Sequence, residues 1–224
     1  LHIVTWGMAV LCLFLVAACA ACIGKDVQKG IEKGLKEKGS IPYQEVGISD
    51  DELSQKYYYQ QLEDGEKQAY KEIVQGVKEN VEEIYVHASD ADRTNMLFQY
   101  VLKDFPEIFW CDGMTTSTSY EGSEAYTVLK PVYLYDAGQK EAMKAKIEAS
   151  VNECLASMPA KDTDYQKILY VYEYIVNTVD YDLEAADNQN IYSVFVNRRS
   201  VCAGYSKATQ YLLERLGVFC TYVT

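Results

Sequence analysis

One cysteine of this sequence lies where thiol chemistry is possible. Cys202 stands in the stretch RRSVCAGYSKA, residues 198–208, between a polar loop and a segment with helical spacing. In the first turn of a helix, unpaired backbone N–H groups and the positive end of the helix dipole favour the thiolate, the nucleophilic form of cysteine. The same N–H groups can hold an oxyanion, and the lack of side-chain bulk at Ala203 and Gly204 would let a substrate carbonyl approach. From position alone, a cysteine that only fills a small apolar space is at least as good an interpretation.

The remaining cysteines and histidines predict no metal site. The seven cysteines are Cys12, Cys19, Cys22, Cys111, Cys154, Cys202 and Cys220. The last four contain no CxxC pair, and the only histidines are His2 and His87, so we expect no metal and no cofactor, and a thiol redox protein is disfavoured. His87, in EEIYVHASDAD, is interpreted as an exposed imidazole near a helix end that takes no part in catalysis.

Composition limits the class of protein. The chain has 224 residues, of which 49% are hydrophobic and 24% charged, so it can bury a core and is not disordered. Its net charge is −12 and its longest basic cluster is Arg198-Arg199. A phosphate backbone would be repelled by such a surface, so we exclude nucleic acid as a partner.

The N-terminus predicts export. Residues 3–23 are almost entirely apolar, and the subsequence Leu15-Val16-Ala17-Ala18-Cys19 resembles the bacterial lipobox, in which the cysteine receives a lipid and becomes the mature N-terminus. We therefore expect a signal peptide and lipobox over 1–22, lipid attachment at Cys19, and a membrane-anchored protein facing outside the cytoplasm. An uncleaved membrane-spanning helix is the alternative, because about 20 apolar residues can cross a bilayer. Without an initiator Met or a basic segment before the apolar run, we expect that residues are missing before Leu1.

Behind the anchor, a charged segment rich in glycine predicts a flexible tether over 23–49. Residues 50–160 are expected to form a small α+β region. Its elements are helices within 50–80, over 90–102 and over 139–158, with two or three antiparallel strands within 107–136.

The last third predicts two more helices and a strand. The first helix, within 163–182, has an apolar face that we expect to be buried, made by Ile168, Tyr172, Ile175 and Val179. The second helix begins near Cys202, could be capped by Ser200, and ends at Gly217. The β-branched and aromatic run 218–224 predicts a strand.

The stretch SVCAGYSKATQYLLERLGVFCTYVT resembles the nucleophile segment of the transglutaminase-like superfamily. In that segment a Val-Cys-x-Gly-Tyr opening leads into a helix ending Leu-Leu-x-x-Leu-Gly, followed by a strand that contains a cysteine. The stretch from Tyr174 to Asp182 is similar to the helix that precedes the cysteine in these domains. The resemblance covers roughly 164–224.

The resemblance implies an α+β fold with a transglutaminase-like core of the papain-like cysteine protease type, whose N-terminal part would be 161–224. It also implies a Cys-His-Asp triad that transfers acyl groups through a thioester resolved by an amine or water. Cys202 corresponds to the nucleophile. No residue corresponds to the histidine or aspartate, which in the family lie on later strands, so we expect the chain to continue beyond Thr224 and residues 1–224 to be inactive alone.

The predicted function is a cell-surface thiol acyltransferase or peptidase acting on a protein or peptide, such as a cell-wall peptide. The alternative is an inactive transglutaminase-like binding or scaffolding module of the cell envelope. A histidine and an aspartate on the following strands would distinguish the two.

Overall fold

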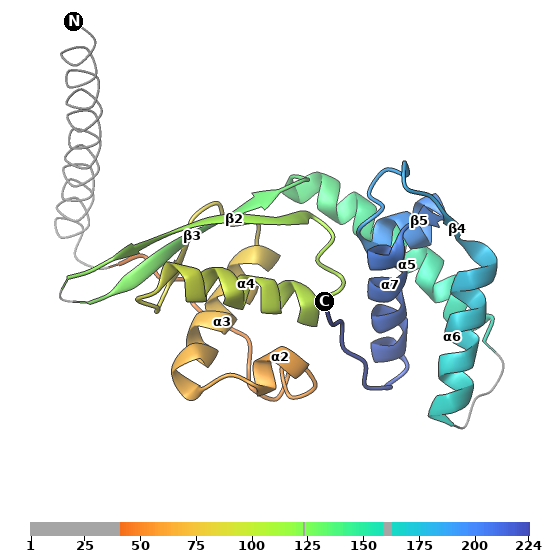
Figure 1. Ribbon diagram of the computed structural model, residues 1–224, viewed down its shortest axis with the longest axis horizontal. Helices are drawn as coiled ribbons and strands as arrows, with labels where there is room; N and C mark the ends of the chain where they lie inside the picture. The colour runs from red at the N-terminus through yellow and green to blue at the C-terminus, as the bar shows by residue number, and fades with distance from the viewer. Residues whose placement is uncertain (1–40, 123, 159–162) are drawn as a thin grey trace, which may run out of the picture. The chain divides into compact units, whose positions relative to one another are not determined.

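The computed structural model describes residues 41–122, 124–158 and 163–224 (Figure 1). The chain divides into units 1–42 and 43–224, and the description below concerns the second unit. The predicted signal segment with Cys19 and most of the predicted tether lie outside the described residues. Within the described ranges, no helix combines the length and the apolar character needed to cross a membrane.

The first half of the unit is a small antiparallel sheet covered by helices (Figure 1). The strands pair in the order β1-β3-β2, and α4 packs against β2 and β3 while α3 packs against α4 and β1. The elements are α2 (Tyr57–Gln60), α3 (Asp64–Lys78), β1 (Ile84–Val86), α4 (Ala91–Asp104), β2 (Cys111–Tyr120) and β3 (Tyr126–Tyr133).

Local sequence accounts for most of these elements. The Asp90 carboxylate accepts from the backbone N–H groups of Asp92 and Arg93, and α4 ends at Asp104, with Phe105 as its C-cap directly before a proline. The predicted helix over 90–102 and the predicted antiparallel strands within 107–136 are confirmed. Strand β1 was missed, because a three-residue strand is too short to show periodicity and exists through pairing with β3, Ile84 opposite Leu129.

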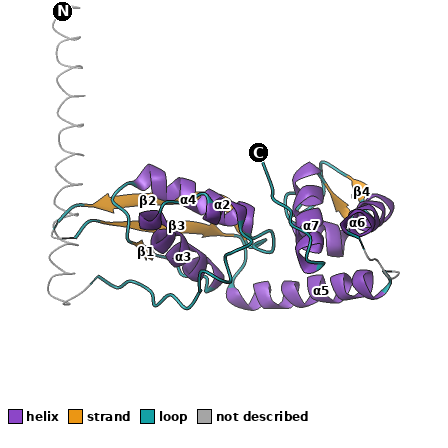
Figure 2. Ribbon diagram, turned by 90° about the horizontal axis from the view of Figure 1, so that it is seen from below, coloured by secondary structure: helices purple, strands orange, loops and turns teal. Residues whose placement is uncertain are grey.

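The second half is mainly helical, and α5 extends from the sheet-containing half to the other helices (Figure 2). The side chain of Asp136 begins α5 by accepting from the Gln139 N–H, and that of Thr163 begins α6 by accepting from the Gln166 N–H. The elements are α5 (Ala137–Ala156), α6 (Asp164–Thr178), β4 (Asp180–Tyr181), the π-helical turn η1 (Ser193–Asn197), β5 (Arg199–Ser200) and α7 (Cys202–Arg215).

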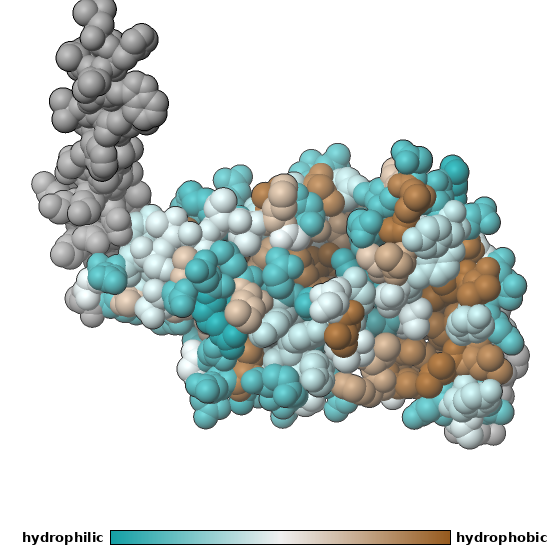
Figure 3. Space-filling view, viewed as in Figure 1, coloured by the Kyte–Doolittle hydropathy of each residue, from teal (hydrophilic) through white to brown (hydrophobic). Residues whose placement is uncertain are grey.

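Only half of the predicted buried face of helix α6 is buried. Ile175 and Val179 are buried as predicted, whereas Ile168 and Tyr172 are 44% and 61% exposed and Val171 is buried instead. Figure 3 shows apolar side chains gathered on the surface over α6 and the end of α7. Because the sequence ILYVYEYIV is apolar around nearly the whole helix, its spacing could not decide which face meets the core.

The predicted strand over 218–224 is absent: these residues form no regular structure. A strand exists only through a ladder of hydrogen bonds with a neighbour, and no strand of the described residues pairs with this run.

One hydrophobic core joins the two halves and extends from Leu53 in the first half to Val218 in the second half. The mixture of helices with a small antiparallel sheet agrees with the predicted α+β class.

Candidate active site around Cys202

Cys202 is the first residue of α7 and is exposed to solvent. The N-cap residue, Val201, supplies no side-chain acceptor. Within the described residues, the backbone N–H groups of Cys202, Ala203 and Gly204 meet no acceptor and the Cys202 thiol has no hydrogen-bond partner. The sulfur therefore lies beside an uncapped helix N-terminus that can stabilise an anion.

Ser200 does not cap α7, contrary to the sequence prediction. Its hydroxyl is fully buried, donates to the carbonyl oxygen of Asn188 at 2.9 Å and lies 2.6 Å from the hydroxyl of Ser193. The Ser193 hydroxyl donates to the carbonyl oxygen of Asn190 at 2.7 Å. These bonds fasten the loop at 188–190 to the start of α7 and so hold the position of Cys202.

Gly204 serves packing rather than substrate access. A Cβ at this position would lie 2.0 Å from the Ser200 hydroxyl and 3.0 and 3.1 Å from the carbonyl oxygens of Asn188 and Asn190. The first turn of α7 thus presses directly on the preceding loop, where only glycine fits. The expectation that its small size opens the backbone to a substrate is wrong.

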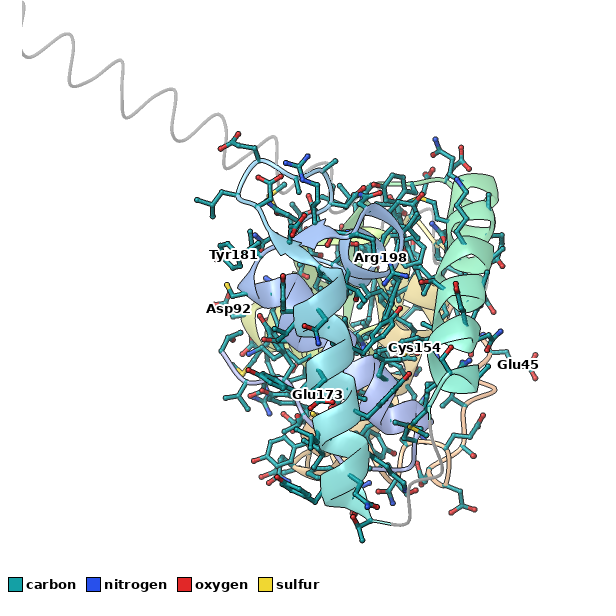
Figure 4. All side chains as sticks on the ribbon, turned by 90° about the vertical axis from the view of Figure 1, so that its right-hand side faces the viewer. Glu45, Asp92, Cys154, Glu173, Tyr181 and Arg198 are labelled. Atoms are coloured by element: carbon teal, nitrogen blue, oxygen red, sulfur yellow. The ribbon has the colours of Figure 1, made fainter. Side chains whose placement is uncertain are left out.

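Arg198 fixes the turn that leads into the site, a role that sequence analysis missed. Its backbone is left-handed, with φ 57° and ψ 23°. Its guanidinium donates to the hydroxyl of Tyr174 on α6 and to the hydroxyl of Ser150 on α5, each at 2.8 Å. Figure 4 shows Arg198 between these two helices. The only signal in the sequence was a pair of arginines, and their spatial partners lie 24 and 48 residues away.

An apolar groove of about 470 Å³ follows the same face of α7. Its walls are Tyr172, Ile175 and Val176 of α6, Tyr205, Ser206 and Thr209 of α7, and residues 220–223. Cys202 lies one turn before Tyr205 and Ser206, so it stands on this face at the end of the groove. Burial raises the pKa of Tyr222 in the groove, and the nearby Cys202 contributes to the rise.

His87 contacts acidic and aromatic side chains and not Cys202. Its Nδ1 meets the fully buried carboxylate of Glu72, its Nε2 lies 3.6 Å from Glu124, and its ring stacks on Tyr43 with centroids 3.5 Å apart. Neither His87 nor any other imidazole or carboxylate of the described residues hydrogen bonds with Cys202. The histidine and aspartate implied by the resemblance have no counterpart there.

The other described cysteines are less accessible than Cys202. Cys154 is buried, Cys111 and Cys220 are half-buried, and all are free thiols. Burial raises the pKa of Cys111 to about 12 and also raises the pKa of Cys154 and of Cys220. Within the described ranges, no group of three or more His, Cys, Asp or Glu side chains could hold a metal ion.

The C-terminal part of the chain matches a known family. The model of the transglutaminase-like superfamily matches residues 154–224, which include α6, α7 and Cys202. The resemblance predicted from the sequence is therefore confirmed for this part. No curated protein matches the chain.

Proposed function

We propose that this chain carries a transglutaminase-like domain for thiol acyl transfer, with Cys202 as the nucleophile. The Cys202 sulfur attacks the carbonyl carbon of an amide, the C–N bond breaks, and the amine leaves with a proton. An amine or a water molecule then attacks the thioester, the acyl group is transferred and the thiolate is released.

The observation that carries the proposal is the exposure of the Cys202 thiol at the uncapped start of α7. The N–H groups of that first turn suit an oxyanion, and the groove beside them offers apolar contacts for an acyl donor such as a peptide. The family match over 154–224 supports the same assignment.

Turnover of an amide also needs a general acid, an imidazole within about 3 Å of the reacting atoms, to protonate the leaving amine. The described residues supply no such acid at Cys202, so the proposed turnover requires a group that these residues do not provide. An activated ester does not need this help, because its leaving group departs without a proton. Acylation and turnover can therefore be tested separately.

The test is to incubate the chain with p-nitrophenyl acetate and locate the acetyl group by peptide mass spectrometry. We expect a thioester at Cys202, which Cys202→Ala abolishes and Cys220→Ala, a matched loss of one thiol in the groove, leaves unchanged. An adduct on Cys220 or Cys154 in preference to Cys202 would refute the assignment of the nucleophile.

The second candidate is a binding module of the cell envelope that keeps the fold without the chemistry. It is favoured by the absence of a histidine partner at Cys202 within the described residues. A ligand that binds Cys202→Ala as well as the unaltered chain, with no thioester on either, would support this alternative.

We also propose that the protein is exported and anchored by a lipid at Cys19. Metabolic labelling with a radioactive fatty acid tests this, since Cys19→Ala should lose the label and Cys22→Ala should keep it. Label that persists in Cys19→Ala would exclude Cys19 as the anchor.

A further inference from the structure

A second cavity lies away from Cys202, at the other end of α7. It has a volume of about 530 Å³ and is lined from α7 by Tyr211, Glu214 and Arg215. Tyr211 follows Cys202 by nine residues, which is roughly 14 Å along a helix. Its apolar lining comes from other elements and consists of Phe109, Trp110, Ile147 and Ile191.

Lys140, on α5, brings a buried positive charge to this cavity. It is 7% exposed, and its Nζ donates to the carbonyl oxygen of Lys78 at 2.8 Å and to the Asn80 side-chain oxygen at 2.6 Å. It also lies 4.9 Å from the centroid of the Trp110 ring. Its nearest carboxylate, that of Glu141, is 4.0 Å away and largely exposed. A buried ammonium is costly without a well-placed counter-charge, and the long contact with the largely exposed Glu141 is the only ion pair of Lys140 among the described residues.

Two further lysines line the same cavity, Lys78 at the end of α3 and Lys144 one turn after Lys140. Neither forms an ion pair within the described residues. Burial lowers the pKa of Lys140; Glu141 opposes this shift, and the charge of Lys144 adds to it. These three lysines face Glu107 and Glu141, because the other two lining carboxylates, Glu148 and Glu214, are paired with Arg215 and Lys56. The lining therefore keeps an excess of one positive charge, which suits a monoanion.

The acidic residues of the cavity leave room for that anion. Glu148 accepts from the Tyr211 hydroxyl at 2.5 Å and from Arg215 at 2.7 Å, and Glu214 pairs with Lys56 at 2.8 Å. Glu107 and Glu141 also line the cavity, and their charges act on Lys78 and Lys140 respectively. A ligand with a second negative charge would be repelled by Glu107, whereas one with an apolar body would meet the aromatic lining.

We propose that this cavity binds a small organic monocarboxylate with an apolar body. The carboxylate meets the ammonium groups of Lys78, Lys140 and Lys144, and the apolar body packs on Phe109, Trp110 and Ile147. This site is independent of any chemistry at Cys202.

The test uses Trp110 as the reporter in the full chain carrying Trp6→Phe, which leaves Trp110 as the only indole. We expect N-acetyl-L-phenylalanine to change its fluorescence saturably. The neutral N-acetyl-L-phenylalanine amide should bind at least roughly tenfold more weakly, since hydrogen bonds to a charged group are worth about 1.5–3 kcal/mol.

Lys144→Gln should weaken binding of the acid by about tenfold for the same reason. Lys146→Gln is the matched control, because Lys146 lies on the same helix, is exposed and does not line the cavity. Far-UV circular dichroism checks that both variants keep their helices.

Equal affinity for the acid and the amide, no effect of Lys144→Gln, or no saturable response to the acid would each overturn the proposal. Inorganic phosphate that binds as tightly as the acid would overturn the assignment of an apolar body.

Discussion

At the scale of single residues, the environment of each cysteine sets its reactivity. A thiol reacts as its thiolate, and burial disfavours that ion, which raises the pKa of Cys111 to about 12 and also raises those of Cys154 and Cys220. Cys202 is exposed at a helix N-terminus, so a reagent in solution can reach its sulfur. The distinction depends on tertiary structure, because nothing in the sequence separates these cysteines by burial.

We therefore predict that iodoacetamide at pH 8 alkylates Cys202 faster than Cys111, Cys154 or Cys220. Peptide mass spectrometry over a time course measures the order. Raising the pH toward 12 should bring Cys111 into reaction, because its thiolate forms only there. Early modification of Cys111 at pH 8 would contradict the buried position of that thiol.

The tight packing of Gly204 against Ser200 can also be tested by a single substitution. We predict that Gly204→Ala destabilises the protein by about 1–3 kcal/mol, the usual cost of overpacking, because the new Cβ overlaps the Ser200 hydroxyl. The measurement is the midpoint of urea unfolding followed by circular dichroism.

Gly65→Ala is the matched control for Gly204→Ala. Gly65 also lies in the first turn of a helix, but a Cβ there has nothing within 4 Å. We expect this change to stabilise the protein by about 0.4–1 kcal/mol through a smaller loss of backbone entropy. Equal effects of the two substitutions would mean that Gly204 is not tightly packed.

At the scale of elements, Arg198 connects α5, α6 and the turn before α7. The Ser150 hydroxyl, which accepts from Arg198, also donates to the Phe195 carbonyl oxygen in η1 at 2.8 Å. One guanidinium thus sets the direction in which the chain enters α7.

The neighbouring arginines allow a direct comparison. We predict that Arg198→Ala costs at least about 2 kcal/mol of unfolding free energy, since each hydrogen bond to a charged group is worth about 1.5–3 kcal/mol. Arg199→Ala should cost less than Arg198→Ala, because the Arg199 side chain is 62% exposed and makes one ion pair, with Asp182, whereas Arg198 donates to two helices. Equal losses in urea unfolding would show that Arg198 does not hold the helices together.

At the scale of the whole unit, the sheet-containing half and the helical half share one hydrophobic core. Trp110 lies in the first half and Cys154 in the second, and both are buried in that core. Two halves with a common core should not unfold independently.

We predict a single unfolding transition for residues 43–224. In urea, the fluorescence of Trp110, with Trp6→Phe as background, and the alkylation of Cys154 should change at the same midpoint. Two separated midpoints would instead support the domain boundary predicted from the sequence near residue 160.

The sequence alone determined features that depend on neighbouring residues: helix starts, a helix end and the family resemblance of the segment around Cys202. The starts of α4, α5 and α6 depend on Asp90, Asp136 and Thr163, whose side chains bind backbone groups two or three residues away. Gly217 ends α7 with φ 73°, as predicted; its N–H donates to the Glu214 carbonyl oxygen, and the N–H of Val218 donates to that of Leu213. Cys202 and its relation to the transglutaminase-like superfamily were likewise visible in a contiguous segment.

Only the tertiary structure decided the roles of residues whose partners lie far away in the sequence. The roles of Ser200, Gly204 and Arg198 are set by contacts with other loops and helices, and the same holds for the buried face of α6 and for strand β1. Residues 218–224 have the composition of a strand but no partner among the described residues. The physical reason is that short-range hydrogen bonds are specified by neighbours in the chain, whereas packing and strand pairing depend on what the fold places alongside.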